Sequence, residues 1–209
     1  NSIPATLENI RQIPEADAYL VAVPFYNKPT QEGMYLYFKA IAQAAPAPVI
    51  MYNVPGRTGV NMLASTTLRI AREVPNIVGI KEASGNLQQC REIIEGAPKG
   101  FAVLSGDDDM TFDIISAGGH GVISVASNIL PAEVTRMCHL ALDGRLEQAA
   151  ELNARLLPLM KGCFVESNPI PVKAALAELG LCGAGMRLPL TEATSQTKET
   201  LKEILKEWK

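Results

Sequence analysis

The sequence predicts an α/β fold of the β/α-barrel type, followed by a domain made of helices. Short apolar runs recur about every 25–30 residues, which is the repeat length of a strand–helix–strand unit. Amphipathic segments with helical spacing lie between these runs. Polar residues follow the runs, at the strand ends where β/α barrels carry their chemistry.

Five apolar runs are predicted to form the strands. Polar residues rarely interrupt them, which favours parallel strands covered on both faces over half-exposed antiparallel ones. The strands are expected at residues 18–23, 49–53, 77–81, 102–105 and 121–125. No GxGxxG follows any of them, so the sequence does not support a dinucleotide-binding fold.

Helical periodicity predicts the remaining elements. Between the strands, helices are expected at residues 33–45, 64–73 and 110–117. After residue 127 the strand pattern stops, and helices are expected at 131–142, 146–161, 171–179 and 197–208.

Five strands are too few to close an eight-stranded barrel. We therefore expect a (β/α)8 TIM barrel that lacks its first three βα units in this chain. The partial barrel is expected to cover residues 1–143 and the C-terminal helical domain residues 144–209.

Composition argues against several classes of partner. The chain is 47% hydrophobic and 20% charged, with a net charge of −3 and no block of like charge. Its basic residues are scattered and only 5% of residues are aromatic, so a nucleic-acid surface is not expected.

No targeting or metal-binding signal stands out. The apolar runs are far shorter than the ~20 residues that span a bilayer, and the first ten residues do not form a signal peptide. The four cysteines have irregular spacing, which favours free, mostly buried thiols in a reducing cytoplasm. His120 and His139 do not pair with ligands at metal-site spacing.

Lys81 is the most informative residue. It ends the apolar run that begins at Ile77, where sheet residues are normally buried. Burial lowers the pKa of a lysine, and an uncharged amine is a nucleophile for carbonyl carbon. The alternative is a lysine whose stem is buried while its charge stays in water.

Two other residues share the expected rim. Tyr52 ends the preceding strand, and adjacent strands lie ~4.8 Å apart, so both side chains can reach one pocket, where a phenol could relay protons. Arg57 lies in a turn with Pro55 and two glycines, where a guanidinium could grip a carboxylate. The alternatives are a half-buried structural tyrosine and a solvated surface arginine.

Three further motifs are ambiguous. Tyr26, beside prolines in a loop, fits packing or a subunit contact at least as well as catalysis. Residues 118–121 (GGHG) fit a helix terminator better than a phosphate cradle, because no Lys-Ser/Thr follows. Residues 107–109 (DDD) fit a rim loop or a helix N-cap better than a cation site.

Taken together, these segments resemble the dihydrodipicolinate synthase / N-acetylneuraminate lyase family from about residue 18 to the C-terminus. The matching strings are PFYNKPTQEG (24–33), YNVPGRTG (52–59), GIKEASGN (79–86), LSGDD (104–108), GGHGVISV (118–125) and NPIPVK (168–173). YNVPGRTG and NPIPVK resemble the synthase branch more than the sialic-acid lyases. The ordered pair of YN-P and IKE motifs is specific to the family.

The resemblance implies roles for six residues. Lys81 would form the Schiff base, Tyr52 would relay protons, and Tyr26 would reach across a dimer interface as a second relay. The carboxylate-binding arginine falls on Arg57. The pyruvate pocket would be lined by the backbone carbonyl of Ile123, and the glycine near the site falls on Gly106.

The resemblance also implies an activity: a lyase of lysine and diaminopimelate biosynthesis that condenses pyruvate with aspartate 4-semialdehyde. It implies no metal or organic cofactor, and a homo-oligomer, either a dimer or a tetramer. Two alternatives stay open: another pyruvate-dependent aldolase of the family, such as an N-acetylneuraminate or keto-deoxy-sugar lyase, and a catalytically inactive truncated paralogue.

Two departures from the family pattern stand out. The TTGES-type motif, whose threonine links the two tyrosines, does not occur in these residues. Phe25 stands where members inhibited by lysine usually carry tyrosine, which argues against that feedback.

Overall fold

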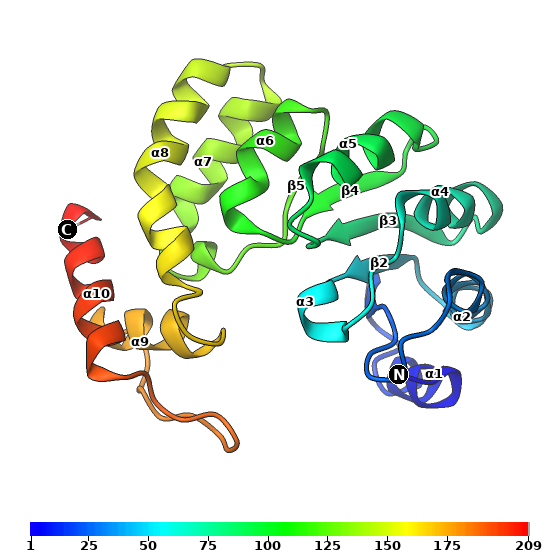
Figure 1. Ribbon diagram of the computed structural model, residues 1–209, viewed down its shortest axis with the longest axis horizontal. Helices are drawn as coiled ribbons and strands as arrows, with labels where there is room; N and C mark the ends of the chain where they lie inside the picture. Colours follow the sequence, from blue (N-terminus) through cyan, green and yellow to red (C-terminus); the bar gives the residue numbers. More distant parts are fainter. Residues whose placement is uncertain (209) are drawn as a thin grey trace. The chain divides into compact units, whose positions relative to one another are not determined.

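A five-stranded parallel sheet organises the first part of the chain in the computed structural model, which describes residues 1–208 (Figure 1). The strands lie side by side in sequence order, and each pairs in parallel with the next. They are β1 (Tyr19–Ala22), β2 (Val49–Asn53), β3 (Ile77–Glu82), β4 (Ala102–Ser105) and β5 (Gly121–Val122). The predicted parallel order is confirmed, but β5 is shorter than expected.

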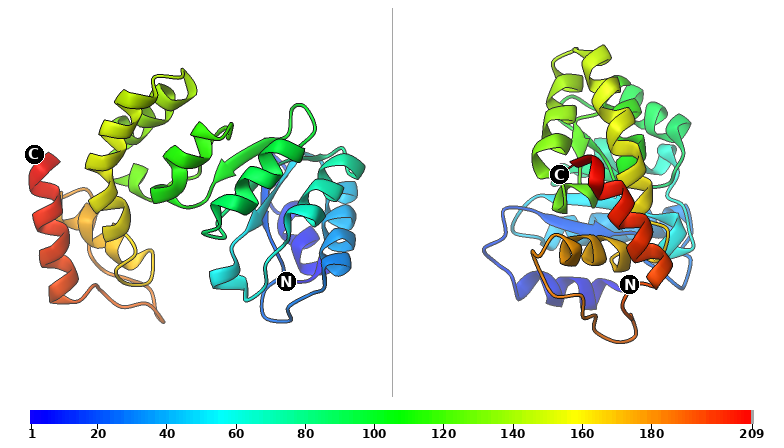
Figure 2. Two further views of the ribbon diagram at one scale, coloured as in Figure 1. Left: turned by 45° about the horizontal axis from the view of Figure 1, so that its top comes forward. Right: turned by 90° about the vertical axis from the view of Figure 1, so that its left-hand side faces the viewer.

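Helices connect the strands. They are α1 (Ile3–Arg11), α2 (Gln31–Ala44), α3 (Pro55–Thr58), α4 (Ala64–Glu73), α5 (Leu87–Gly96) and α6 (Thr111–Ser116). Helix α4 packs against both α2 and α5, and Figure 2 shows these three helices in a row along the sheet. Helices α1 and α5 were not expected from the sequence, and α3 occupies the turn that carries Arg57.

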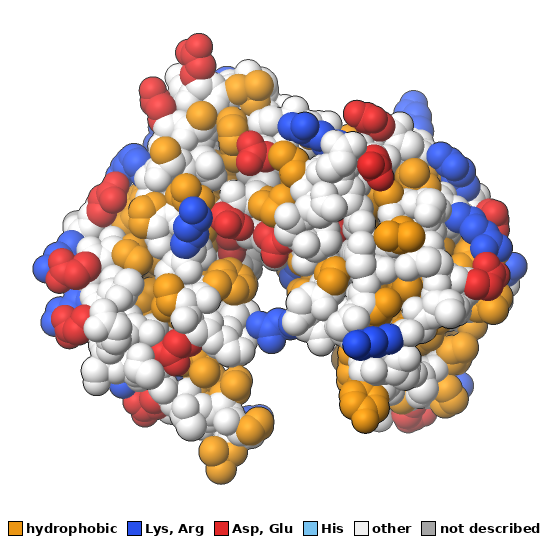
Figure 3. All heavy atoms as spheres, viewed as in Figure 1, with side chains coloured by type: hydrophobic (Ala, Val, Ile, Leu, Met, Phe, Trp, Pro, Cys, Tyr) orange, Lys and Arg blue, Asp and Glu red, His pale blue; other side chains and the backbone are white. Residues whose placement is uncertain are grey.

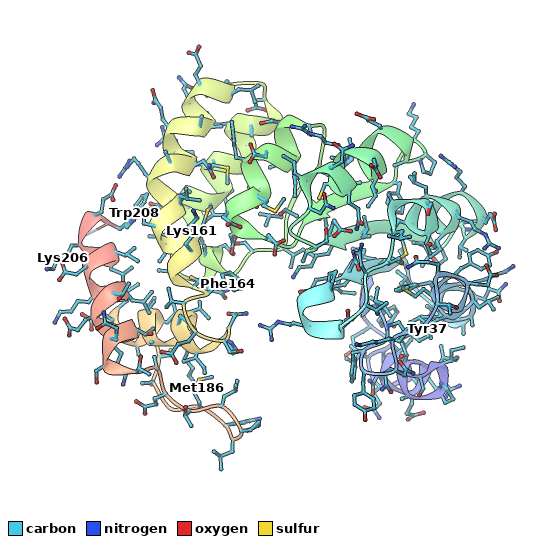
Figure 4. The ribbon with its side chains drawn as sticks, in the orientation of Figure 1. Tyr37, Lys161, Phe164, Met186, Lys206 and Trp208 are labelled. Carbon is cyan, nitrogen blue, oxygen red and sulfur yellow. The ribbon has the colours of Figure 1, made fainter. Side chains whose placement is uncertain are left out.

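The core of this part lies between the sheet and its helices. Side chains alternate along a strand, and Val49, Met51 and Ile80 on one face are fully or almost fully buried. Phe38 and Ile41 of α2 belong to the same cluster. Helix α1 adds to it through Ile10, and its Thr6 hydroxyl lies 2.8 Å from the hydroxyl of Tyr37, the α2 residue labelled in Figure 4.

The regular structure in the rest of the described chain is helical, with a long connection between residues 179 and 194. It contains α7 (Pro131–Leu142), α8 (Leu146–Gly162), α9 (Ile170–Glu178) and α10 (Ser195–Leu205). Helix α7 packs on α8, and α10 packs on both α8 and α9. Short 3₁₀ turns lie at Ala126–Asn128 and Lys206–Trp208.

The chain divides into two compact units, and the boundary between them differs from the predicted boundary. Unit 1 covers Asn1–Ile123 and unit 2 covers Ser124–Lys209, whereas the sequence analysis placed the boundary between residues 143 and 144. The physical reason is the packing of α7, which makes its main contacts with α8 and so joins the helical unit.

Charged side chains of both signs are interspersed on the face shown in Figure 3. None of the helices within residues 1–208 is both long enough and apolar enough to cross a membrane.

Candidate active site

The pair of Lys81 and Tyr52 forms the centre of the site. The two residues are direct neighbours across β2 and β3, and the Lys81 Nζ lies 4.4 Å from the centre of the Tyr52 ring. Because side chains alternate along a strand, both point away from the face that buries Met51 and Ile80. Both are half-buried, and the predicted side-by-side placement of the two residues is confirmed.

Burial sets the protonation of this pair. It lowers the pKa of the Lys81 amine, while the charges of Asp107 and Asp108 act in the opposite direction. Burial raises the pKa of the Tyr52 phenol; the charge of Arg57 opposes this effect and that of Asp107 adds to it. At neutral pH the site therefore pairs a protonated phenol with an amine that gives up its proton more readily than an exposed lysine.

Gly106 borders the lysine at the end of β4. Its backbone N–H donates to the Glu82 carbonyl at 2.7 Å, which holds the glycine against β3. A Cβ added to Gly106 would lie 2.5 Å from the Ala83 Cβ and 3.1 Å from the Lys81 Cε. A side chain at this position would therefore clash with Ala83 and crowd the lysine stem.

Ile123 continues the strand order beside this loop. Its backbone N–H donates to the Ser105 carbonyl at 3.0 Å, one residue beyond β5. Lys81, Tyr52, Gly106 and Ile123 therefore all belong to the carboxyl-terminal edge of the sheet in unit 1.

Arg57 and Tyr26 belong to two loops that meet at this edge. The Tyr26 backbone N–H donates to the Thr58 carbonyl at 3.3 Å, so loop 24–29 is attached to α3. Arg57 is exposed on α3, close enough for its charge to act on Tyr52. The Tyr26 side chain is 88% exposed with a backbone φ of 71°, and it does not pack against the lysine pair.

Asp107 is the main group that the sequence analysis did not place in the site. Its backbone carbonyl accepts from the Ser105 hydroxyl at 2.7 Å and the Thr111 hydroxyl at 3.1 Å, and its Oδ2 accepts from the Gly85 N–H at 3.2 Å. Burial raises the pKa of its carboxyl group, and the Gly85 N–H opposes this effect. The sequence signal for Asp107 is its position two residues beyond the end of β4, directly after Gly106.

The neighbouring ambiguous motifs have structural roles. Asp108–Met110 forms a 3₁₀ turn before α6, in agreement with a rim loop rather than a cation site. Gly118 follows the end of α6 with a φ of 103°, as expected for a glycine that terminates a helix. Within residues 1–208, no group of three His, Cys, Asp or Glu side chains could hold a metal ion.

This arrangement suits chemistry on a carbonyl group. An amine with a lowered pKa can add to a carbonyl carbon, and the adjacent phenol can exchange protons with the adduct. A nearby guanidinium, Arg57, can bind a carboxylate on the reacting molecule.

Comparison with known proteins gives a consistent result. The model of the dihydrodipicolinate synthetase family matches residues 11–208. The 4-hydroxy-tetrahydrodipicolinate synthase of Cellvibrio japonicus is 53% identical over 190 residues, covering 91% of this chain. That of Thermotoga neapolitana is 47% identical over 212 aligned positions, covering 99% of this chain and 72% of the relative.

Solved structures agree with this result. The dihydrodipicolinate synthase of Thermotoga maritima has a TM-score of 0.97 at 46% identity, covering 99% of this chain and 72% of that chain. The Acinetobacter baumannii enzyme, whose structure holds pyruvate, has a TM-score of 0.95 at 44% identity. The match covers 99% of this chain and 71% of that chain. The chain spans 65% of the length of the Cellvibrio japonicus relative.

Proposed function

Because the chain belongs to the dihydrodipicolinate synthetase family, we propose that it condenses pyruvate with aspartate 4-semialdehyde through a Schiff base on Lys81. The observation that carries this proposal is the half-buried Lys81 amine, with a lowered pKa, 4.4 Å from the Tyr52 ring. The product would be a hydroxylated tetrahydrodipicolinate.

The proposed reaction begins with covalent capture of pyruvate. The Lys81 nitrogen adds to the ketone carbon to give a carbinolamine, which loses water to form an imine. Tyr52 donates the proton that leaves with the water, which gives a protonated imine and a phenolate. The phenolate then takes a proton from the methyl group, and the imine nitrogen accepts the electron pair to give a neutral enamine.

The second half joins the two substrates. The enamine carbon bonds to the aldehyde carbon of the semialdehyde, and the aldehyde oxygen takes a proton to become a hydroxyl. The amino group of the semialdehyde then attacks the imine carbon, closes the ring and releases Lys81 as a free amine. Every bond change is internal to the two substrates, Lys81 and Tyr52, so the proposed cycle uses no organic cofactor and no metal.

The other site residues have proposed supporting roles. Arg57 would bind the carboxylate of the semialdehyde, and the Ile123 carbonyl would line the pyruvate pocket. Gly106 would leave room for the lysine stem. Tyr26 would act as a second relay in a neighbouring subunit, which its 88% exposure makes sterically open.

We also propose the larger assembly to which this chain corresponds. Strands β1–β5 would be the fourth to eighth strands of a (β/α)8 barrel, with a helical domain after them. Their parallel, sequential order and the 65% coverage of the Cellvibrio japonicus relative support this assignment. A homo-oligomer, a dimer or tetramer, fits the exposed Tyr26, and a cytoplasmic location fits the irregular spacing of the four cysteines.

Borohydride trapping tests the central proposal. The chain is incubated with pyruvate and sodium borohydride, and intact mass is followed by peptide mapping. We expect one reduced pyruvyl adduct on Lys81 in the wild type and none in Lys81→Arg. An unmodified wild-type chain, or an adduct spread over surface lysines, would overturn the proposal.

A substrate test separates the synthase from a sugar aldolase. Replacement of Arg57 by Ala should lower turnover of aspartate semialdehyde while pyruvate trapping continues, because the guanidinium is assigned to the second substrate alone. Equal turnover in Arg57→Ala and wild type would remove the proposed role of Arg57.

A further inference from the structure

Glu82 is a buried carboxylate that the proposed reaction does not use. It follows Lys81 at the end of β3 and is 1% exposed. Burying a carboxylate is costly unless its oxygens are hydrogen-bonded, so its partners indicate why the fold retains it.

Groups of Ser84, Asn53 and Gln89 form hydrogen bonds with the Glu82 carboxylate. Oε1 accepts from the Ser84 backbone N–H at 2.8 Å and the Asn53 Nδ2 at 3.1 Å. Oε2 accepts from the Asn53 Nδ2 at 3.0 Å and the Gln89 Nε2 at 3.2 Å. Each of these groups donates, which favours the ionised carboxylate. Burial is the larger effect and raises the pKa of the Glu82 carboxyl group, while the hydrogen bonds lower it.

The partners of Glu82 are themselves fixed. The Asn53 Oδ1 accepts from the Met62 backbone N–H at 3.0 Å, and its Nδ2 also lies 2.8 Å from the Asn61 Oδ1. The Asn61 Nδ2 donates to the Gln89 Oε1 at 2.8 Å, and the Gln89 Nε2 lies 3.2 Å from the Met62 carbonyl. Glu82, Asn53, Gln89 and Asn61, here called the polar clasp, thus join β2, β3, α5 and the segment before α4.

The polar clasp lies one residue beyond the Lys81–Tyr52 pair. Asn53 and Glu82 are the last registered pair of β2 and β3, and Tyr52 and Lys81 are the pair before it. The clasp side chains point to the helix-covered face and the reactive side chains to the other face. The Glu82 carbonyl also accepts from the Gly106 N–H, which connects the clasp to β4.

We infer that Glu82 is a positioning residue: its carboxylate clasps β2 to β3 at the end of the ladder and so holds the Lys81 amine beside Tyr52. Strand ends are where pairing is weakest, and a fully hydrogen-bonded charge fixes the two backbones more firmly than an apolar contact would. This inference rests on the proposed function of Lys81.

The test uses the change of one atom. In Glu82→Gln, one carboxylate oxygen becomes an NH2 group that must face the donors of Asn53 or Gln89. Displacement of a reacting group by about 1 Å can lower a rate roughly 100-fold, so we expect pyruvate trapping on Lys81 to slow roughly 10- to 100-fold with the concentration for half-saturation nearly unchanged. Glu92→Gln, an exposed site on α5, makes the same chemical change and should trap at the wild-type rate.

A conservative variant separates positioning from general stability. Glu82→Asp keeps the carboxylate on a shorter side chain, and we expect it to trap pyruvate faster than Glu82→Gln. Gln89→Met removes one hydrogen bond to the Glu82 carboxylate, together with the Gln89 bonds to Asn61 and the Met62 carbonyl, and should slow trapping less than Glu82→Gln. If Glu82→Gln does not fold by circular dichroism, Gln89→Met is used for the test instead.

A second readout does not depend on pyruvate. Reductive methylation with formaldehyde and cyanoborohydride at neutral pH, mapped by peptide mass, should label wild-type Lys81 ahead of exposed lysines and lose that preference in Glu82→Gln. If wild type fails to trap pyruvate, the proposed function is wrong. The comparison of Lys81 methylation in wild type and Glu82→Gln still tests whether the polar clasp positions Lys81. A folded Glu82→Gln chain that matches wild type in both assays overturns the inference.

Discussion

At the scale of single residues, opposing electrostatic effects act on Lys81. Burial lowers the pKa of its amine, and Asp107 and Asp108 raise it. A free amine is needed to attack pyruvate, whereas the imine that follows carries positive charge when protonated. A nearby carboxylate therefore hinders the first step and assists the later ones, so the balance at this residue sets the pH range of the proposed reaction.

Asp107→Asn tests this balance. Removal of the carboxylate charge removes an effect that raises the Lys81 pKa, so the amine should lose its proton at lower pH. We expect the acid limb of Lys81 methylation, measured against pH, to move to lower pH than in wild type. Turnover should fall because the protonated imine loses a counter-charge.

Asp109→Asn is the matched control for Asp107→Asn. It makes the same change at the exposed neighbour, whose charge acts on Asp107, whereas the charges that raise the pKa of Lys81 are those of Asp107 and Asp108. If the acid limb of Lys81 methylation moves equally in Asp107→Asn and Asp109→Asn, the net charge, rather than the position of Asp107, controls the pKa of the Lys81 amine.

Gly106→Ala tests the close approach at the same lysine. The added Cβ would meet the Ala83 Cβ at 2.5 Å, and neither group can move without displacing backbone. We expect a loss of about 1–3 kcal/mol in the free energy of unfolding and slower pyruvate trapping. Gly183→Ala, where no atom lies within 4 Å of the new Cβ, should leave both unchanged.

Part of this site could be predicted from the sequence, and the rest could not for a physical reason. The pairing of Tyr52 with Lys81 follows from strand order and the position of each residue at a strand end. Asp107 and Glu82 could not be assigned in the same way, because their roles depend on the direction of a loop and on side-chain partners from β2 and α5. Nothing in the spacing of Asn53, Asn61 and Gln89 marks them as partners of Glu82.

At the scale of elements, the helices and strands with a strong apolar pattern are those whose bounds the sequence predicts best. β2 and α4 have the predicted bounds. Helix α5 was missed because a glutamine, Gln89, occupies one of its buried positions, and α1 because it buries only Ile10. β5 is shorter than predicted because its ladder with β4 ends at Val122.

The start of α10 offers a test at this scale. The Thr194 side chain accepts from the Thr197 N–H at 3.3 Å, and its backbone N–H and hydroxyl donate to Glu166 at 3.0 and 2.9 Å. Thr194→Ala removes the cap and should lower the free energy of unfolding by about 1 kcal/mol in urea titrations. Thr200→Ala, inside the same helix, should cost much less, because alanine favours the helical state.

At the scale of the whole molecule, the two compact units have separate packing. The principal core cluster contains only residues of unit 1. The single tryptophan, Trp208, lies in unit 2, where the Arg155 guanidinium stands 4.7 Å from its ring centre and Arg155 also pairs with Glu207 at 3.3 Å. Tryptophan fluorescence therefore reports on unit 2, and circular dichroism on both units.

This separation leads to a prediction about cooperativity. In urea, Gly106→Ala should lower the stability seen by circular dichroism and leave the midpoint of the Trp208 fluorescence transition in place. Thr194→Ala should move the fluorescence midpoint, because α10 and Trp208 belong to the same unit. A substitution destabilises the residues that pack around it, and each of these two substitutions lies within one unit. If both variants shift both probes by the same amount, the units unfold as a single cooperative body, and the lysine site depends on the helical unit for its stability.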